Sequence, residues 1–146
     1  MGGYNSALLM ERHGDLFKRV VLGCPGLFTI NPFSSTDEIA AYVTRTAATG
    51  SSVDAGLQLL GADEVGLTVD DWERNNPLTQ VTTLGPSSPM LFVWYGDNDQ
   101  FGFDEGAAEF ISSATLLGVR VTQIHNAGVH CQLDTAIEAQ LASFLQ

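Results

Sequence analysis

The sequence predicts an α/β fold in which parallel strands are flanked by helices, with a small helical insertion. The final third of the chain alternates apolar, strand-like segments with helical segments, and the connections between them are short. Nearer the start, the apolar run Val20 to Leu22 is closed by Cys24-Pro25-Gly26, which is typical of a buried parallel strand. Because strand–helix–strand connections within one sheet are almost always right-handed crossovers, these segments indicate a single parallel sheet.

The first expected elements are a helix and a strand. Residues 3–13 contain the helix-favouring run Ala7 to Glu11, and Gly14 is expected to end the helix. The segment Phe17–Cys24 follows and carries the apolar run of the first strand. Its residues favour a position buried inside the sheet.

Residues 27–78 are less regular and predict a cap-like helical insertion within one domain that covers residues 1–146. Ser35 or Thr36 is suited to cap a helix over residues 37–43. A second helix is expected over residues 53–60, ended by Gly61, and a third from Thr68 to the residue before Pro77.

The final third predicts the alternation that defines the fold class. The expected elements are a loop at 85–88, a strand at 89–95, a helix at 104–117, a strand at 119–124 and a helix at 134–145. Each segment is bounded by turn-forming or helix-capping residues. Their order predicts that the two strands are parallel.

Composition limits the function classes. The 146 residues are 45% apolar and 16% charged, which predicts one soluble folded domain. The balance of 17 acidic against 6 basic residues argues against nucleic acid and anionic membranes as partners. No apolar run approaches the length of about 20 residues that a membrane span needs. No signal-peptide pattern opens the chain, and the compartment stays open, with the cytoplasm favoured.

The cysteines and histidines do not predict a metal or cofactor. Cys24 and Cys131 are too few for a disulfide framework and neither lies in a CxxC pair, so no metal site is expected. Cys24 ends a buried strand and is expected in the core. Cys131 follows His130, and neighbouring side chains rarely point at each other, so a structural or incidental cysteine is favoured over a thiol nucleophile.

Two polar clusters follow the last two predicted strands. Gly96-Asp97-Asn98-Asp99 comes after the first, and Asn126-Ala127-Gly128-Val129-His130 comes after the second. Functional groups of open parallel sheets lie beyond the carboxyl ends of the strands. An acid and a histidine there would let a carboxylate fix the imidazole tautomer during acyl transfer. The plain alternatives are a polar turn for the acids and a surface position for His130, with His125 as another candidate histidine.

These segments resemble the α/β-hydrolase family. Pro89 to Asp99 is similar to that family's proline-led strand and acid loop, in which a glycine and two residues precede the catalytic aspartate. The resemblance implies Asp99 as the acid, with Asp97 as the alternative, and His130 as the histidine. The family often places glycine directly before its histidine, whereas Val129 intervenes here.

The start of the chain resembles the family's nucleophile elbow, Gly-x-Ser-x-Gly, just after the serine. Met1 would be the second x and Gly2 the last glycine. This implies the C-terminal part of an α/β-hydrolase fold whose nucleophile precedes Met1, with the Met1 backbone N–H in the oxyanion hole.

The resemblance implies a serine-type hydrolase of esters or other small acyl compounds, inactive without its N-terminal half. We also expect a companion N-terminal half, or self-association, to cover the unpaired edge at Phe17–Cys24. The alternative is a non-catalytic α/β binding or interaction module with a degenerate hydrolase site. A flavodoxin-like domain is disfavoured, because no phosphate-binding loop follows a first strand.

Overall fold

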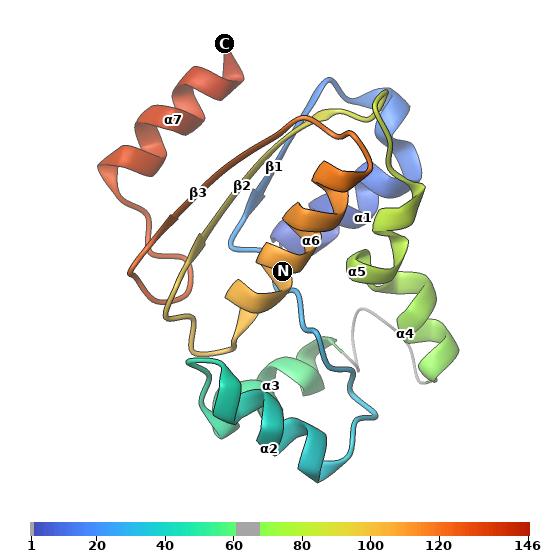
Figure 1. Cartoon of the computed structure of the whole chain (residues 1–146), viewed down its shortest axis with the longest axis vertical. Coiled ribbons are helices and arrows are strands. Elements are labelled where there is room, and N and C mark those ends of the chain that lie inside the picture. Colours follow the sequence, from blue (N-terminus) through green and yellow to red (C-terminus); the bar gives the residue numbers. More distant parts are fainter. Residues whose placement is uncertain (1, 61–67) are drawn as a thin grey trace.

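The chain folds around a three-stranded parallel sheet in the order β1-β2-β3 (Figure 1). The computed structural model describes residues 2–60 and 68–146. The strands are β1 Arg19–Gly23, β2 Met90–Gly96 and β3 Val121–Asn126. Both strand pairs are parallel, with Gly23 opposite Trp94 and Gly96 opposite Asn126. The predicted α/β class and parallel sheet are confirmed.

Helices cover both faces of the sheet and the end where its strands terminate. They are α1 Gly2–His13, α2 Thr36–Arg45, α3 Gly50–Leu59, α4 Val69–Asn75, α5 Pro77–Gln80, α6 Phe103–Leu116 and α7 Thr135–Leu145, with 3-10 turns η1 Gly14–Leu16 and η3 Val81–Thr83. Figure 1 shows α7 on one side of the sheet and α1 and α6 on the other. No helix in these two ranges is long and apolar enough to cross a membrane.

Strand β2 has apolar residues on both of its faces, because side chains along a strand alternate between the two sides of a sheet. Leu91 and Val93 belong to the larger core, which includes side chains of α1 and α6. Phe92 and Trp94 belong to the smaller core with Ile137 of α7. This double burial is what the uninterrupted apolar run in the sequence predicts.

Side-chain caps explain where the helices of the 27–78 region begin. Ser35, and not Thr36, caps α2: its Oγ accepts from the Glu38 amide, and the Ser35 amide donates to Glu38 Oε2 at 2.7 Å. Thr49 caps α3, so this helix begins three residues before the predicted 53. Thr68 caps α4 as expected. In each case a hydroxyl satisfies a free amide of the first turn.

Three further features differ from the sequence prediction: the extent of β1, the start of β3 and the presence of α5. Gly61, the expected end of the helix over residues 53–60, lies outside the described residues. β1 is shorter than Phe17–Cys24, because Cys24 adopts φ +37 and leaves the extended conformation. β3 begins two residues later than 119, because Gly118 at φ +85 and the Val119 amide still complete the end of α6. The short helix α5 was not predicted; Asn76 caps it and Pro77 occupies its first turn.

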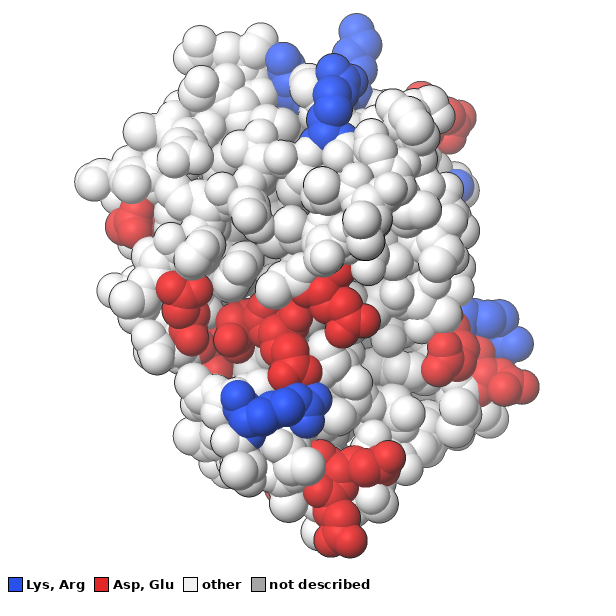
Figure 2. Space-filling model, viewed as in Figure 1, with Lys and Arg blue, Asp and Glu red and all other residues white. Residues whose placement is uncertain are grey.

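In Figure 1, α2 and α3 lie beyond the carboxyl ends of the strands, whereas α4 and α5 lie beside the sheet. α5 contacts α1, α4 and α6. The assignment of residues 27–78 to one insertion stays a prediction. Figure 2 shows acidic side chains grouped across the middle of the face drawn, with a basic group directly below them.

The Glu11 carboxyl on α1 is mostly buried, and neither of its oxygens has a hydrogen-bond partner among the described residues. Burial raises its pKa from 4.5 to about 9, and the nearby Arg12 lowers it only in part. The folded chain therefore holds a neutral Glu11 through the neutral pH range. The unfolded chain ionises this carboxyl near its ordinary pKa.

We expect the free energy of unfolding to fall as pH rises from about 5 to about 9, because the folded chain holds one more proton at Glu11 in this interval. The slope approaches about 1.4 kcal/mol per pH unit. Urea denaturation at several pH values measures it. Glu11→Gln should remove the slope, whereas Glu109→Gln, an exposed glutamate on α6, should retain it. An unchanged slope in Glu11→Gln would contradict the prediction.

Candidate active site

Two loops meet at the carboxyl ends of β2 and β3. We call residues 97–102 the acid loop and residues 127–133 the histidine loop. The Asp97 amide donates to the Asn126 carbonyl at 2.8 Å, and the Asn98 amide donates to the Gly128 carbonyl at 3.0 Å. The Asn98 side chain donates to the Ala127 carbonyl at 2.9 Å. These bonds continue the β2–β3 pairing beyond the strands and hold the two loops together.

Gly96 makes this close approach possible. A Cβ built at Gly96 would lie 2.5 Å from the carbonyl oxygens of both Gly128 and Val129. No side chain fits there without displacing the histidine loop. The glycine that the family resemblance places before the acid therefore has a packing role in this chain.

Asp99 is completely buried and faces His130. Its Oδ2 lies 2.7 Å from His130 Nδ1, and its Oδ1 accepts from the Phe101 amide at 2.8 Å. A buried carboxylate is costly unless its oxygens are paired, and here both oxygens have partners. The structure thus brings together the two residues that the sequence singled out.

The His130 ring is held on several sides and is one-fifth exposed, at 22%. An ionised carboxylate only accepts hydrogen bonds, so Nδ1 is the donor in this contact, and in a neutral ring Nε2 is then the acceptor. Phe101 and Phe103 contact the ring edge-on, with centroid distances of 5.2 and 5.4 Å. The His130 amide donates to Gln100 Oε1 at 3.2 Å.

A second acid–histidine pair lies nearby. His125 Nδ1 lies 2.8 Å from Asp97 Oδ1, and both side chains are about half exposed. The His125 ring also stacks on Tyr95, its neighbour across the β2–β3 pair. The alternative acid and the alternative histidine therefore pair with each other, and water screens this pair far more than the buried Asp99–His130 pair.

An apolar pocket of about 130 Å³ adjoins His130. It is lined by His130 and by Gly26, Gly56, Leu59, Leu60, Phe101 and Phe103. The sequence did not indicate Leu59 and Leu60, because α3 reaches the pocket only through the tertiary fold. The local signal for this wall of the pocket is the mixture of small and apolar residues along α3.

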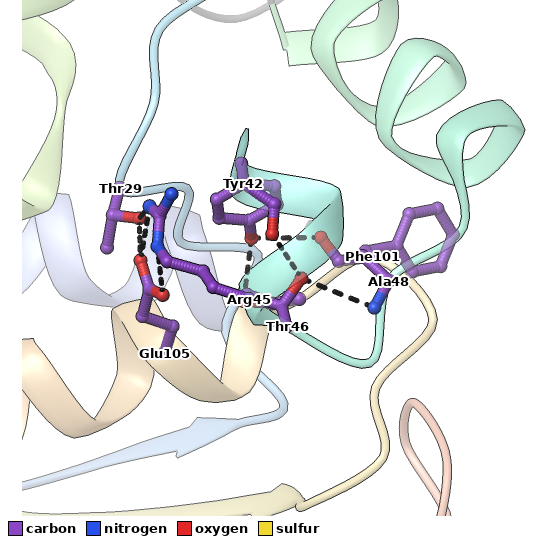
Figure 3. A network of polar contacts seen from close by, with 8 residues as sticks. Thr29, Tyr42, Arg45, Thr46, Ala48, Phe101 and Glu105 are labelled. Carbon is purple, nitrogen blue, oxygen red and sulfur yellow. Dashed lines mark hydrogen bonds and ion pairs between the residues drawn. The ribbon is translucent and has the colours of Figure 1, made fainter. Parts of the chain in front are cut away.

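Helix α2 is anchored to the acid loop at one point and to the first turn of α6 at another (Figure 3). The Tyr42 hydroxyl contacts the carbonyl oxygens of Phe101 and Gly102 at 3.0 and 2.7 Å. Arg45 donates from Nε and Nη2 to the two oxygens of Glu105, each at 2.8 Å. Burial raises the pKa of Glu105, but hydrogen bonds from Arg45 and Thr29 outweigh it and hold this pKa below its ordinary value.

Residues next to the buried acid respond to its charge. Burial is the main cause of a raised pKa at Asp104, and the charge of Asp99 adds to it. Burial, then the charges of Glu105, Asp104 and Asp99, also raise the pKa of the Tyr42 hydroxyl, so Tyr42 stays protonated. The neutral Tyr42 hydroxyl is therefore a stable donor to the acid loop.

The structure joins the two cysteines, a pairing that the sequence did not predict. Cys24 and Cys131 form a disulfide, with 5.3 Å between their Cα atoms and a sequence separation of 107. Of the two expected alternatives for Cys131, structural or incidental, the disulfide supports the structural one. The disulfide ties the histidine loop to the carboxyl end of β1 and leaves Cys131 Sγ 3.4 Å from His130 Nε2. The oxyanion prediction for Met1 lies outside the described residues.

No family model matches the chain, and no curated protein matches it in sequence. Among solved structures, the chain is similar to a crystal structure of a mutant of the esterase rPPE, with a TM-score of 0.67 and 17% identity. The similarity covers 99% of this chain and 49% of that one, so this chain spans about half the length of the esterase. The chain therefore shares the α/β fold of part of that esterase.

We expect reduction of the Cys24–Cys131 disulfide to lower the free energy of unfolding by about 2–5 kcal/mol, because the bond closes a long loop of the unfolded chain. Denaturant titrations with and without a phosphine reductant measure the change. Cys131→Ser is the control, because reductant should not alter its stability. Equal stability of the oxidised and reduced chains would contradict the prediction.

Proposed function

We propose that this chain is the C-terminal portion of a serine-type hydrolase of ester or acyl substrates and supplies the triad acid Asp99 and the histidine His130. The observation that carries the proposal is the 2.7 Å contact between buried Asp99 and the ring of His130. Its position beyond two adjacent parallel strands is where catalytic groups of open sheets lie. The esterase-like fold supports the same class.

The proposed chemistry assigns one task to each nitrogen of His130. Nδ1 donates to Asp99, which fixes the ring and stabilises the imidazolium. Nε2 takes the proton of a serine that precedes Met1 in the intact enzyme, while that serine attacks the carbonyl carbon. The same nitrogen then returns the proton to the leaving group. The Met1 backbone N–H stabilises the developing oxyanion.

The apolar pocket beside His130 suggests the substrate class. Its walls are aliphatic and aromatic, and its volume of about 130 Å³ suits a short acyl chain. The pocket therefore favours an esterase of uncharged acyl substrates over a hydrolase of charged substrates. With 17 acidic and 6 basic residues, the chain has a net negative charge, which does not attract anionic substrates.

A fluorophosphonate probe tests the proposal, because it labels only an activated serine. We expect labelling and ester hydrolysis in the protein that includes the residues encoded before Met1, and neither in residues 1–146 alone. Loss of a triad nucleophile lowers kcat by about 10⁶-fold in the best-studied case. A long form that remains unlabelled would favour the non-catalytic binding module.

Variants of the long form identify the acid in the same assay. Asp99→Asn should lower kcat by about 10³- to 10⁴-fold, because it removes the charge that stabilises the imidazolium. Asp97→Asn is the matched variant, since Asp97 pairs with the exposed His125. Equal losses from both variants would contradict the assignment of Asp99.

We also propose that a companion N-terminal half, or a second copy of this chain, pairs with the free edge of β1. Among the described strands, β1 pairs only with β2, and its Val20 and Val21 are half-buried. An apolar strand with one unpaired edge favours association. In the intact enzyme the strand that leads to the nucleophile would occupy this edge.

The isolated chain should therefore self-associate with rising concentration, as sedimentation velocity can measure. Val21→Lys should weaken the association, because it places a charge on the edge strand. Val69→Lys, an exposed position on α4, should associate like the unchanged chain. A compact monomer at every concentration would contradict the prediction.

A further inference from the structure

Three ligand-type atoms converge at the end of β1 and the histidine loop. Cys24 Sγ, Cys131 Sγ and a ring nitrogen of His130 all lie within 4.8 Å of one another, and Cys131 Sγ lies 3.4 Å from His130 Nε2. In this structure the two sulfurs are joined as a disulfide. We propose that, once this disulfide is reduced, the two thiolates and His130 Nε2 bind one Zn²⁺ ion.

The distances suit a tetrahedral centre. Zn²⁺ binds thiolate sulfur at about 2.3 Å and imidazole nitrogen at about 2.0–2.1 Å, which places neighbouring sulfur and nitrogen ligands about 3.6 Å apart. Cys131 Sγ and His130 Nε2 are already 3.4 Å apart. The two sulfurs must separate from bonding distance to about 3.8 Å. Rotation of the cysteine side chains gives this separation at the observed Cα spacing of 5.3 Å.

Asp99 prepares His130 to act as a ligand. A metal-binding histidine commonly donates its second nitrogen to a carboxylate, which fixes the tautomer and makes the ligating nitrogen more basic. Asp99 is fully buried and its Oδ2 lies 2.7 Å from Nδ1, so Nε2, which lies 3.4 Å from Cys131 Sγ, is the nitrogen left to bind a metal. The second histidine, His125, has no sulfur ligand beside it among the described residues.

The ligand set is that of a zinc site with an open position. Two sulfurs and one imidazole match the preference of Zn²⁺ for soft and borderline ligands. Three protein ligands leave the fourth position to water or to another small molecule. Cys24 is buried and Cys131 is exposed, so the site is accessible from the side of the histidine loop.

Metal binding and disulfide formation exclude each other. A thiol reductant transfers two electrons and two protons to the disulfide, giving two cysteine thiols and an oxidised reductant. Zn²⁺ then replaces the two thiol protons, which pass to solvent. A small-molecule disulfide reverses the process: it takes two electrons from the thiolates, re-forms the Cys24–Cys131 bond and releases Zn²⁺.

Metal titration of the oxidised and the reduced 146-residue chain tests the inference. The reductant is a phosphine, which takes oxygen from water and does not compete as a thiol ligand. Co²⁺ is the spectroscopic probe, and Zn²⁺ is measured by competition with a chromophoric chelator. We expect one metal per reduced chain, with thiolate-to-cobalt charge transfer and the intense visible bands of a four-coordinate ion. The oxidised chain should bind none.

Matched variants separate this site from general thiolate binding. His130→Asn should weaken Zn²⁺ binding and remove the four-coordinate Co²⁺ spectrum, whereas His125→Asn should change neither. Asp99→Asn should weaken Zn²⁺ binding by about 10- to 100-fold, and Asp97→Asn should not. Cys24→Ser removes one ligand and should also abolish one-to-one binding.

Three results would overturn the inference. The first is equal metal binding by the oxidised and reduced chains. The second is equal affinity in His130→Asn and His125→Asn. The third concerns folding, which circular dichroism measures. If the reduced chain unfolds and added Zn²⁺ does not restore the folded spectrum, the inference is wrong. None of these results depends on the proposed hydrolase activity.

Discussion

The pairing of Gly96 with Asn126 at the carboxyl ends of β2 and β3 is the contact on which the site depends. It aligns the two strands so that the acid loop and the histidine loop leave the sheet side by side. The amides of Asp97 and Asn98 then extend the pairing into the loops. Asn126 fixes the start of the histidine loop through bonds to Gly128 and Asp134. The parallel register of β2 and β3 thus brings Asp99 next to His130.

The two acid–histidine pairs contain the same chemical groups but differ in their exposure to water. Asp97 and His125 are about half exposed, so water screens their interaction and the pair contributes little to stability. Asp99 is fully buried, and its charge requires His130 and the Phe101 amide as partners. The fold has therefore placed a carboxylate that is costly to bury beside Nδ1 of His130. Because stability alone does not require a charge there, this placement favours a functional role.

The fold class and the acid–histidine pair were predictable because they depend on local signals. Apolar runs, capping residues and strand order are all visible within short windows, and parallel order places successive strand ends together. The disulfide was not predictable, because Cys24 and Cys131 are 107 residues apart and no local pattern records their meeting. The wall formed by Leu59 and Leu60 depends likewise on tertiary packing. The late start of β3 followed from Gly118, which prolongs the end of α6.

The disulfide links the edge strand β1 covalently to the loop that carries His130. Cys24 directly follows β1, and through Cys131 it holds the residue next to His130. A strand that pairs with the free edge of β1 would restrain Cys24 and, through the bond, the histidine loop. Reduction cuts this connection and leaves the position of His130 to the loop contacts and Asp99 alone. A metal on the freed sulfurs would restore the connection but would take the Nε2 lone pair on which the proposed proton transfer depends. If both proposals hold, the redox state of this one bond would determine whether His130 is available as a base.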